Sequence, residues 1–372
     1  MTKKFSIFLT GLFCAFIGGI LALSLILPDQ AFSPLENRYL EKVPELSLET
    51  LKNGEFMEDA EAYTSDHIVG RDLWVALKAW CERLSGKREN NGVYFAGDDT
   101  LINRVDPPSD EKLAQDLGFV DALVGNASVP VYFGLIPSAA AIWADKLPQG
   151  APTADELAII DQLYFSTGAA TIDLAGALAA HKDEAIYYRT DHHWTSLGAF
   201  YGANALLEAM GMEPLNLNDY QKTTVSQDFN GTIFSSSGVR WVTPDTIDIY
   251  VPEETVTVTS YFTGQPEAGE MYVESFLEKK DKYSYFLGGN QPLCVIQSQH
   301  TDAPKVLVIR DSYSDALAPF LSERFSEVHL FDLRYNMTSI HDYVAEHDID
   351  SIVVLYSFSN FVTDKNLGLL GR

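Results

Sequence analysis

The chain has 372 residues, of which 46% are hydrophobic, and its formal net charge is −26. The apolar content excludes a largely disordered chain, and the length allows one large α/β domain or one domain with an insertion. Because no stripe of basic residues is present to neutralise phosphates, we do not expect the chain to bind nucleic acid.

An apolar segment without charged residues, 5–27, follows Lys3 and Lys4. It is long enough to cross a bilayer, and the two lysines predict that its amino-terminal side lies in the cytoplasm. A cleaved signal peptide is the alternative, but the run is long for one and no clean small-x-small cleavage site follows it. We therefore expect a cytoplasmic tip and transmembrane anchor over residues 1–27, a location in the cell membrane, and the rest of the chain outside the cytoplasm.

Residues 28–86 are expected to form a stalk followed by a helical arm. The stalk, to about residue 51, is polar with scattered prolines, which is typical of a spacer. Residues 72–84 carry apolar side chains at helical spacing and Gly86 lies just past them, which predicts an amphipathic helix. We interpret the two tryptophans of this helix as core residues rather than ligand-binding ones.

Strands and helices alternate in the domain expected over residues 87–372. Short runs of branched aliphatic and aromatic residues predict strands, and the longer stretches between them predict helices. The predicted strands are 93–95, 129–136, 170–173, 185–188, 305–309, 328–331 and 351–356, and the predicted helices are 153–165, 174–181 and 195–210. This alternation predicts an α/β fold whose mostly parallel sheet is flanked by helices.

One region departs from this alternation. Residues 221–285 are rich in Thr, Val, Tyr, Ser and Gly, and their apolar residues recur at every second position. The pattern predicts a β-rich insertion. A roof over the active site and a surface for a partner both stay open as its role.

The segment Asp191-His192-His193-Trp194 follows the strand predicted at 185–188. In an extended segment residues i and i+2 share a side, so Asp191 and His193 are expected to point together while His192 points away. A carboxylate beside an imidazole sets its tautomer and stabilises its protonated form, as a general base requires. A polar turn and a metal site are the alternatives, but adjacent histidines are poorly spaced as ligands, and we predict no metal.

Ser312 follows the buried run 305–309, ahead of a weakly helical stretch. A serine at the carboxyl end of a parallel strand, where a helix begins, lies where α/β proteins place their chemistry. Backbone N–H groups at the helix start can stabilise an oxyanion beside it. A helix N-cap is the alternative role. Together with Asp191 and His193, however, Ser312 predicts a Ser-His-Asp set.

Further candidates surround this set. Gly289 and Asn290 precede an apolar strand and are candidates to hold the oxyanion, with a plain turn as the alternative. Tyr313, next to Ser312, and Arg334, which follows a predicted strand, are candidates to contact substrate, and a structural ion pair is equally open for Arg334. Weaker candidates at the ends of other strands are Ser138, Tyr356, Ser357 and Asn360.

The motif at 191–194 resembles that of the bacterial DHHW family, which looks related to the SGNH-hydrolase-like proteins of alginate and other polysaccharide O-acetylation. In those relatives an Asp-x-His-Trp motif supplies the acid and the base, and a serine in a Ser-Tyr-Ser-like block is the nucleophile. The resemblance implies that Asp191 orients the base, His193 is the base and Ser312 is the nucleophile.

The resemblance also implies a permuted SGNH-hydrolase-like fold, because ordinary SGNH hydrolases place the serine first and here it comes last. Glu36-Asn37-Arg38 and residues 63–72 look like the amino-terminal signature of the family. One departure is Arg310, which stands where SGNH proteins usually carry glycine before Asp-Ser.

The function that this resemblance implies is that of a cofactor-free O-acetyltransferase of cell-surface polysaccharide. Its partners would be the membrane, a cell-surface glycan as acceptor and a membrane-bound acyl-donor protein. A carbohydrate esterase or deacetylase with the same triad, and a non-catalytic glycan-binding or assembly protein, are the alternatives.

Overall fold

The computed structural model describes residues 3–252 and 255–371, and the chain divides into two units. One unit comprises the residues up to Asn91 together with Ser235–Trp241. The other comprises Gly92–Phe234 and the chain from Val242 onward. Each unit is described by itself.

The second unit is built on an eight-stranded mixed sheet with the order β11-β10-β12-β14-β13-β15-β6-β7. Five neighbouring strands run parallel: β14 (Glu327–Phe331), β13 (Lys305–Arg310), β15 (Ser351–Ser357), β6 (Val131–Ile136) and β7 (Ala170–Thr171). Three antiparallel strands extend one edge: β12 (Leu293–Gln297), β10 (Thr257–Ser260) and β11 (Glu267–Gly269). The predicted α/β class is therefore confirmed, but the sheet is mixed.

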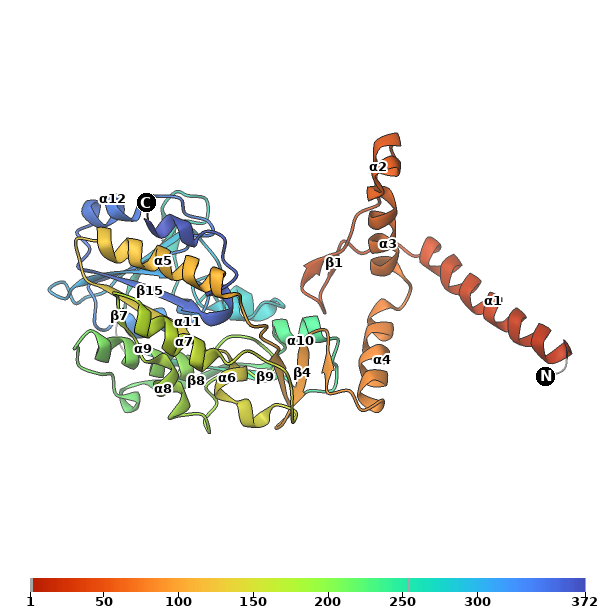
Figure 1. Cartoon of the computed structure of the whole chain (residues 1–372), viewed down its shortest axis with the longest axis horizontal. Helices are drawn as coiled ribbons and strands as arrows, with labels where there is room; N and C mark the ends of the chain where they lie inside the picture. Colours follow the sequence, from red (N-terminus) through yellow and green to blue (C-terminus); the bar gives the residue numbers. More distant parts are fainter. Residues whose placement is uncertain (1–2, 253–254, 372) are drawn as a thin grey trace. The chain divides into compact units, whose positions relative to one another are not determined.

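Helices cover both faces of this sheet. In Figure 1, α5 (Asp110–Asn126) and α12 (Ile340–Glu346) lie on one side of β15, and α9 (Ser196–Ala209) and α11 (Ser314–Leu321) lie on the other. The remaining helices of this unit are α6 (Ala139–Ile142), α7 (Glu156–Ser166), α8 (Leu174–Ala179) and α13 (Phe358–Phe361), while α10 (Thr232–Ser237) crosses into the other unit. A short antiparallel pair joins β4 (Val93–Ala96) to β5 (Thr100–Asn103).

The region predicted as a β-rich insertion is divided between two sheets. β8 (Gln221–Phe229) and β9 (Asp245–Val251) form a separate antiparallel ribbon, whereas β10 and β11 belong to the main sheet. The alternation of apolar residues is common to both, because a strand with one buried face shows it in either sheet.

The strand predicted at 185–188 is not formed. Only one bridge, between Tyr187 and Trp194, is present there. The next residues turn instead, because the Asp245 carboxylate accepts the backbone N–H groups of Arg189 (3.1 Å) and Thr190 (2.8 Å), as well as the Thr190 hydroxyl (2.6 Å). A side chain here satisfies donors that a neighbouring strand would otherwise satisfy.

The first unit contains α1 (Lys3–Ile26), α2 (Leu48–Asn53), α3 (Glu55–His67) and α4 (Arg71–Leu84). It also contains the antiparallel pair of β1 (Phe32–Ser33) and β2 (Arg38–Tyr39), and the two-residue strand β3 (Glu89–Asn90). By length and composition α1 is able to cross a membrane. The predicted helix at 72–84 is confirmed as α4, but its tryptophans are not core residues: Trp74 is 40% and Trp80 42% exposed. The inner face of α4 is occupied by small residues such as Ala79, which is fully buried.

The residues that resemble the amino-terminal family signature form a cluster of ion pairs. Arg38 donates to Glu36 (Nε–Oε2, 2.8 Å) and to Asp66 (Nη1–Oδ2, 2.8 Å), and Arg71 donates to Glu36 (Nη2–Oε2, 2.8 Å). Asp66 also accepts the N–H of Glu41. The hydrogen bond from Arg38 lowers the pKa of Asp66 against the effect of burial, so the carboxylate stays ionised. The cluster fastens the stalk to the start of α4.

Candidate active site

Ser312 lies in the turn between β13 and α11. The four apolar residues of β13, Val306–Ile309, are fully buried, as expected for a strand covered on both faces. The chain leaves the sheet at Asp311, and α11 starts at Ser314. Ser312 is half-buried in this turn, at the carboxyl end of a parallel strand.

The structure brings Ser312, His193 and Asp191 together, although 119 residues separate the first two. The Oγ of Ser312 lies 2.8 Å from Nε2 of His193, and Nδ1 of His193 lies 2.6 Å from Oδ1 of Asp191. Both His193 and Asp191 are buried. The hydroxyl, the imidazole and the carboxylate therefore form a hydrogen-bonded row, as a nucleophile, a base and an orienting acid require.

Asp191 is held from its far side by the start of α10. Its Oδ2 accepts the N–H (2.7 Å) and the hydroxyl (3.0 Å) of Thr232. Gly231 lies so close that a Cβ at this position would be 2.2 Å from the Cβ of Asp191. Burial acts to raise the pKa of Asp191, but the two neighbouring histidines and these hydrogen bonds hold it well below its usual range. The carboxylate is therefore ionised at neutral pH.

His192 does not point away from the site as predicted. Its ring lies 3.9 Å from that of His193, and its Nδ1 makes a 2.6 Å hydrogen bond with the Thr232 hydroxyl. The segment turns rather than running as a strand, so the alternation of sides does not apply. Loss of solvent, and then the proximity of His193, lower the pKa of His192 to about 4.

This turn also places metal-ligand atoms of Asp191, His192 and His193 within 4.8 Å of one another. These side chains already make hydrogen bonds with protein groups: Asp191 with His193 and Thr232, and His192 with Thr232. A metal ion would have to displace the contacts that align His193 with Ser312. The arrangement therefore favours acid–base chemistry over metal ligation.

Tyr283 packs against the imidazole and was not predicted from the sequence. Its ring is stacked on that of His193 with centroids 3.6 Å apart, and its hydroxyl donates to the carbonyl oxygen of Ser312 at 3.1 Å. Burial raises the pKa of Tyr283 well above 10, so the phenol remains a donor. Tyr283 belongs to no recognisable motif. Its region, 221–285, predicted only strands from its period-two alternation.

Tyr313 joins the segment that carries His193 to the turn that carries Ser312. Its side chain is buried, and its hydroxyl donates to the carbonyl of His192. Its own carbonyl accepts from the indole of Trp194 at 2.8 Å, and its N–H donates to Asp311 at 3.1 Å. The side chain is thus a structural link between the Asp-His-His-Trp segment and the serine turn, and the N–H is already in use.

Asp311 anchors the serine turn to the neighbouring strand. Its Oδ2 accepts the N–H (2.8 Å) and hydroxyl (2.7 Å) of Ser357 and the amide of Asn360 (2.7 Å). Ser357 and Asn360 therefore hold the serine turn in place through Asp311. Ser138 follows β6, which ends level with Ser357 of β15, and there it caps α6 while its N–H donates to Glu156. Tyr356 is fully buried.

Arg334 and Asn290 lie at the same end of the sheet as Ser312, because β14 and β13 run parallel and end together. Nη2 of Arg334 donates to Oδ1 of Asn290 at 3.2 Å and to Asp332 at 2.7 Å. Arg334 thus has the ion pair considered as its alternative role, while remaining partly exposed. Gly289 has a φ of 94°, a conformation that favours glycine.

Arg310 occupies the interior beneath the serine turn. Its Nη1 lies 2.9 Å from Oδ1 of Asp315, and both side chains are almost completely buried. Nη1 also donates to the carbonyl of Asp311 at 3.3 Å. Burial raises the pKa of Asp315 to about 7 although Arg310 opposes this shift. The side chain is accommodated beneath the turn, so the residue that differs from the usual glycine leaves the contact between Ser312 and His193 in place.

A family model described as DHHW protein matches residues 93–331. The chain is similar to a DHHW family protein from Eubacterium siraeum, with a TM-score of 0.67 and 25% identity over 76% of this chain and 95% of that chain. It is also similar in fold to Bacillus cereus PatB1, with a TM-score of 0.61 and 22% identity over 72% of this chain and 96% of that chain. A second structure of PatB1 carries a sulfonyl adduct and aligns with a TM-score of 0.61 and 20% identity over 73% and 98% of the two chains. No curated protein matches the chain.

Proposed function

The chain belongs to the DHHW protein family, as its Asp-His-His-Trp motif predicted, and from this premise we propose that it is a membrane-anchored, extracytoplasmic acyl-transfer enzyme with Ser312 as nucleophile. The observation that carries the proposal is the 2.8 Å contact between Ser312 Oγ and His193 Nε2, continued by the 2.6 Å contact between His193 and Asp191. The order Asp191, His193, Ser312 supports a permuted SGNH-hydrolase-like arrangement.

The chemistry takes two steps. His193 accepts the proton of Ser312 as the hydroxyl attacks an acyl carbonyl, and it returns that proton to the leaving group, which gives an acyl-enzyme. An acceptor hydroxyl, deprotonated by the same imidazole, then attacks the acyl group, and Ser312 recovers its proton. Asp191, ionised and doubly held by Thr232, stabilises the imidazolium in both steps.

The oxyanion that forms when Ser312 attacks the acyl carbonyl requires hydrogen-bond donors close to that oxygen. The amide of Asn290 is the candidate, because it lies at the same end of the sheet as Ser312. The N–H groups of Tyr313, Ser314 and Asp315 donate to Asp311 and Ser312 instead. Gly289, whose positive φ favours glycine, forms the turn that carries Asn290. Arg334 fixes the orientation of Asn290 through the hydrogen bond to its Oδ1, which leaves the amide N–H₂ end as the donor.

We propose an acetyl group as the acyl group and a cell-surface polysaccharide as the acceptor. This part of the proposal is supported by the resemblance of the Asp-His-Trp and Ser-Tyr-Ser blocks to polysaccharide O-acetylation proteins. Helix α1 supports attachment to the membrane, where a membrane-bound acyl-donor protein would be within reach. With water as acceptor the same residues constitute an esterase.

The test is covalent labelling of Ser312. The full-length chain in detergent is incubated with an activated acetyl ester, and in parallel with a sulfonyl fluoride, and the adduct is located by mass spectrometry. We expect label on Ser312, none in Ser312→Ala, and unchanged labelling in Ser314→Ala, a matched serine in the same turn. If the parent gains no label and shows no turnover beyond that of Ser312→Ala, the chain is not an enzyme of this kind. Added oligosaccharide then distinguishes transfer to sugar from hydrolysis.

A further inference from the structure

Helix α4 carries a stripe of apolar side chains that face solvent. Leu73, Leu77 and Leu84 are 75%, 51% and 82% exposed. Their spacing of i, i+4 and i+11 places them on one side of the helix. The opposite side packs inside the unit, where Ala79 is fully buried. The surfaces of soluble proteins rarely expose several large aliphatic side chains in one stripe. This side of α4 is therefore expected to contact another apolar surface.

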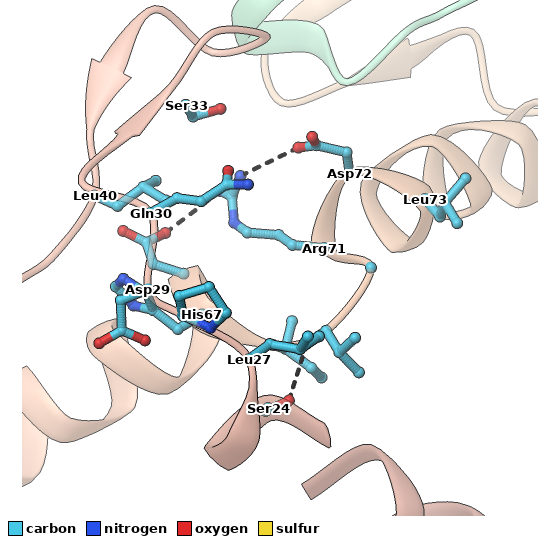
Figure 2. Close-up of a pocket in the computed structure, with 15 residues that line it drawn as sticks. Ser24, Leu27, Asp29, Gln30, Ser33, Leu40, His67, Arg71, Asp72 and Leu73 are labelled. Atoms are coloured by element: carbon cyan, nitrogen blue, oxygen red, sulfur yellow. Dashed lines mark hydrogen bonds and ion pairs between the residues drawn. The ribbon is translucent and has the colours of Figure 1, made fainter. Parts of the chain in front are cut away.

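Two contacts connect the start of α4 with the apolar helix α1. The hydroxyl of Ser24, near the end of α1, accepts the N–H of Val69 at 2.9 Å. Figure 2 draws this bond as the dashed line at Ser24. The rings of Phe16 and Trp74 meet edge to face with centroids 6.2 Å apart. The first turns of α4 therefore lie against the outer half of α1. None of the α1 residues that the structure describes is buried. Because the start of α4 contacts α1, a bilayer around α1 would also contact α4.

A cavity of about 350 Å³ lies at this junction. Charged groups of both signs line it together with aliphatic ones, namely Asp29, His67, Arg71, Asp72, Leu27 and Leu73 (Figure 2). Among the described residues, Nη1 of Arg71 has an ion-pair contact with Asp72 at 3.9 Å but makes no hydrogen bond. Paired opposite charges beside an apolar wall match the phosphate and ammonium of a zwitterionic headgroup.

We propose that α4 is an interfacial helix: the acyl chains of the outer leaflet cover Leu73, Leu77 and Leu84, and a zwitterionic lipid headgroup occupies the cavity beside Arg71. The bilayer is the occupant because Trp74, which lies next to the stripe on α4, contacts Phe16 of the apolar helix α1. Tryptophan beside leucine on an amphipathic helix is typical of the membrane–water interface. This inference rests on the proposed membrane anchor.

The experiment measures quenching by lipid. Full-length protein is reconstituted in phosphatidylcholine liposomes with or without brominated acyl chains, and tryptophan emission is compared for Leu77→Trp and Lys78→Trp in a Trp74→Phe background. These neighbouring positions have almost the same depth along α4 but lie about 100° apart around it. We expect the emission added by Leu77→Trp to be quenched at least twofold and that added by Lys78→Trp to change little. Flotation of the liposomes after a carbonate wash reports the anchor separately.

Each outcome decides one of the two proposals. If the protein floats and Leu77→Trp is quenched no more than Lys78→Trp, the anchor stands and the interfacial role of α4 is overturned, as it would be if a second copy of the chain covered the stripe. If the protein does not float, the anchor fails and the lipid contact of α4 fails with it. Flotation with selective quenching of Leu77→Trp supports both.

Discussion

The imidazole of His193 and the phenol ring of Tyr283 lie almost parallel, with centroids 3.6 Å apart and an interplanar angle of 6°. The hydroxyl of the same tyrosine donates to the carbonyl oxygen of Ser312. One side chain therefore contacts both the proposed base and the segment that carries the proposed nucleophile. We infer that Tyr283 is a positioning residue, since it sets the plane of the imidazole without touching the reacting oxygen.

The stacking predicts a difference between two substitutions at this position. Tyr283→Leu removes the aromatic plane and frees the imidazole to tilt, so we expect the rate of Ser312 acylation to fall on the order of 10- to 100-fold. Tyr283→Phe keeps the ring and loses one hydrogen bond worth about 1 kcal/mol, so the rate should fall less than about tenfold. The acylation rate with an activated ester is the measurement. Equal rates for the two variants would show that the ring does not position His193.

Gly231 makes a second prediction, because it leaves no room for a side chain beside Asp191. Gly231→Ala would bring its Cβ to 2.2 Å from the Cβ of Asp191, so we expect the carboxylate to move, Ser312 labelling to fall, and the free energy of unfolding to drop by about 1–3 kcal/mol. The control is Gly118→Ala on α5, where an added Cβ would meet no atom of the described residues within 4 Å apart from its chain neighbours and its own helix backbone. It should keep labelling and stabilise the protein by up to about 1 kcal/mol. Urea unfolding and labelling measure both effects.

The buried pair of Arg310 and Asp315 predicts a non-additive pattern. Asp315→Leu leaves the Arg310 guanidinium buried without its counter-ion, which should cost about 3–5 kcal/mol of unfolding free energy. The double variant Arg310→Met/Asp315→Leu removes both charges and should recover most of this loss. A double-mutant cycle in urea measures the coupling. If the double variant is as unstable as the sum of the two single variants, the two charges do not act as a pair.

His329 predicts a pH dependence of stability. The side chain is buried between Tyr343 (2.8 Å) and Glu327 (3.0 Å), and loss of solvent lowers the pKa of His329 to about 4 although Glu327 opposes the shift. A histidine with a lowered pKa stabilises the fold above its unfolded pKa of about 6.5, and this contribution is lost as the pH falls from there to about 4. The loss should be on the order of 3 kcal/mol.

The matched variants for this effect are His329→Gln, which bonds but does not titrate, and His341→Gln on the surface. Urea unfolding between pH 7 and pH 4 should show a shallower decline for His329→Gln than for the parent protein. The decline for His341→Gln should follow the parent. A decline in His329→Gln as steep as in the parent would assign the pH dependence to other groups.

Local patterns account for much of the α/β unit. Four buried aliphatic residues identified β13, and Thr195, whose side chain accepts the N–H of Gly198, marked the start of α9. Local pattern did not predict the turn at 185–190, because the Asp245 carboxylate of β9 accepts the backbone N–H groups of Arg189 and Thr190. Strand periodicity also does not separate the β8–β9 ribbon from β10 and β11, because it does not specify the neighbouring strand.

The sequence by itself determined the apolar span of α1, the α/β class, the family motif at 191–194 and the position of Ser312 at the end of a buried strand. These features depend on residue type and short-range spacing. Only the tertiary structure decided that His192 remains beside His193, that Tyr313 links two segments, and that Tyr283, Thr232 and Asp315 surround the site. Most of these contacts join residues distant along the chain, and their partners are set by how the elements pack rather than by any local pattern.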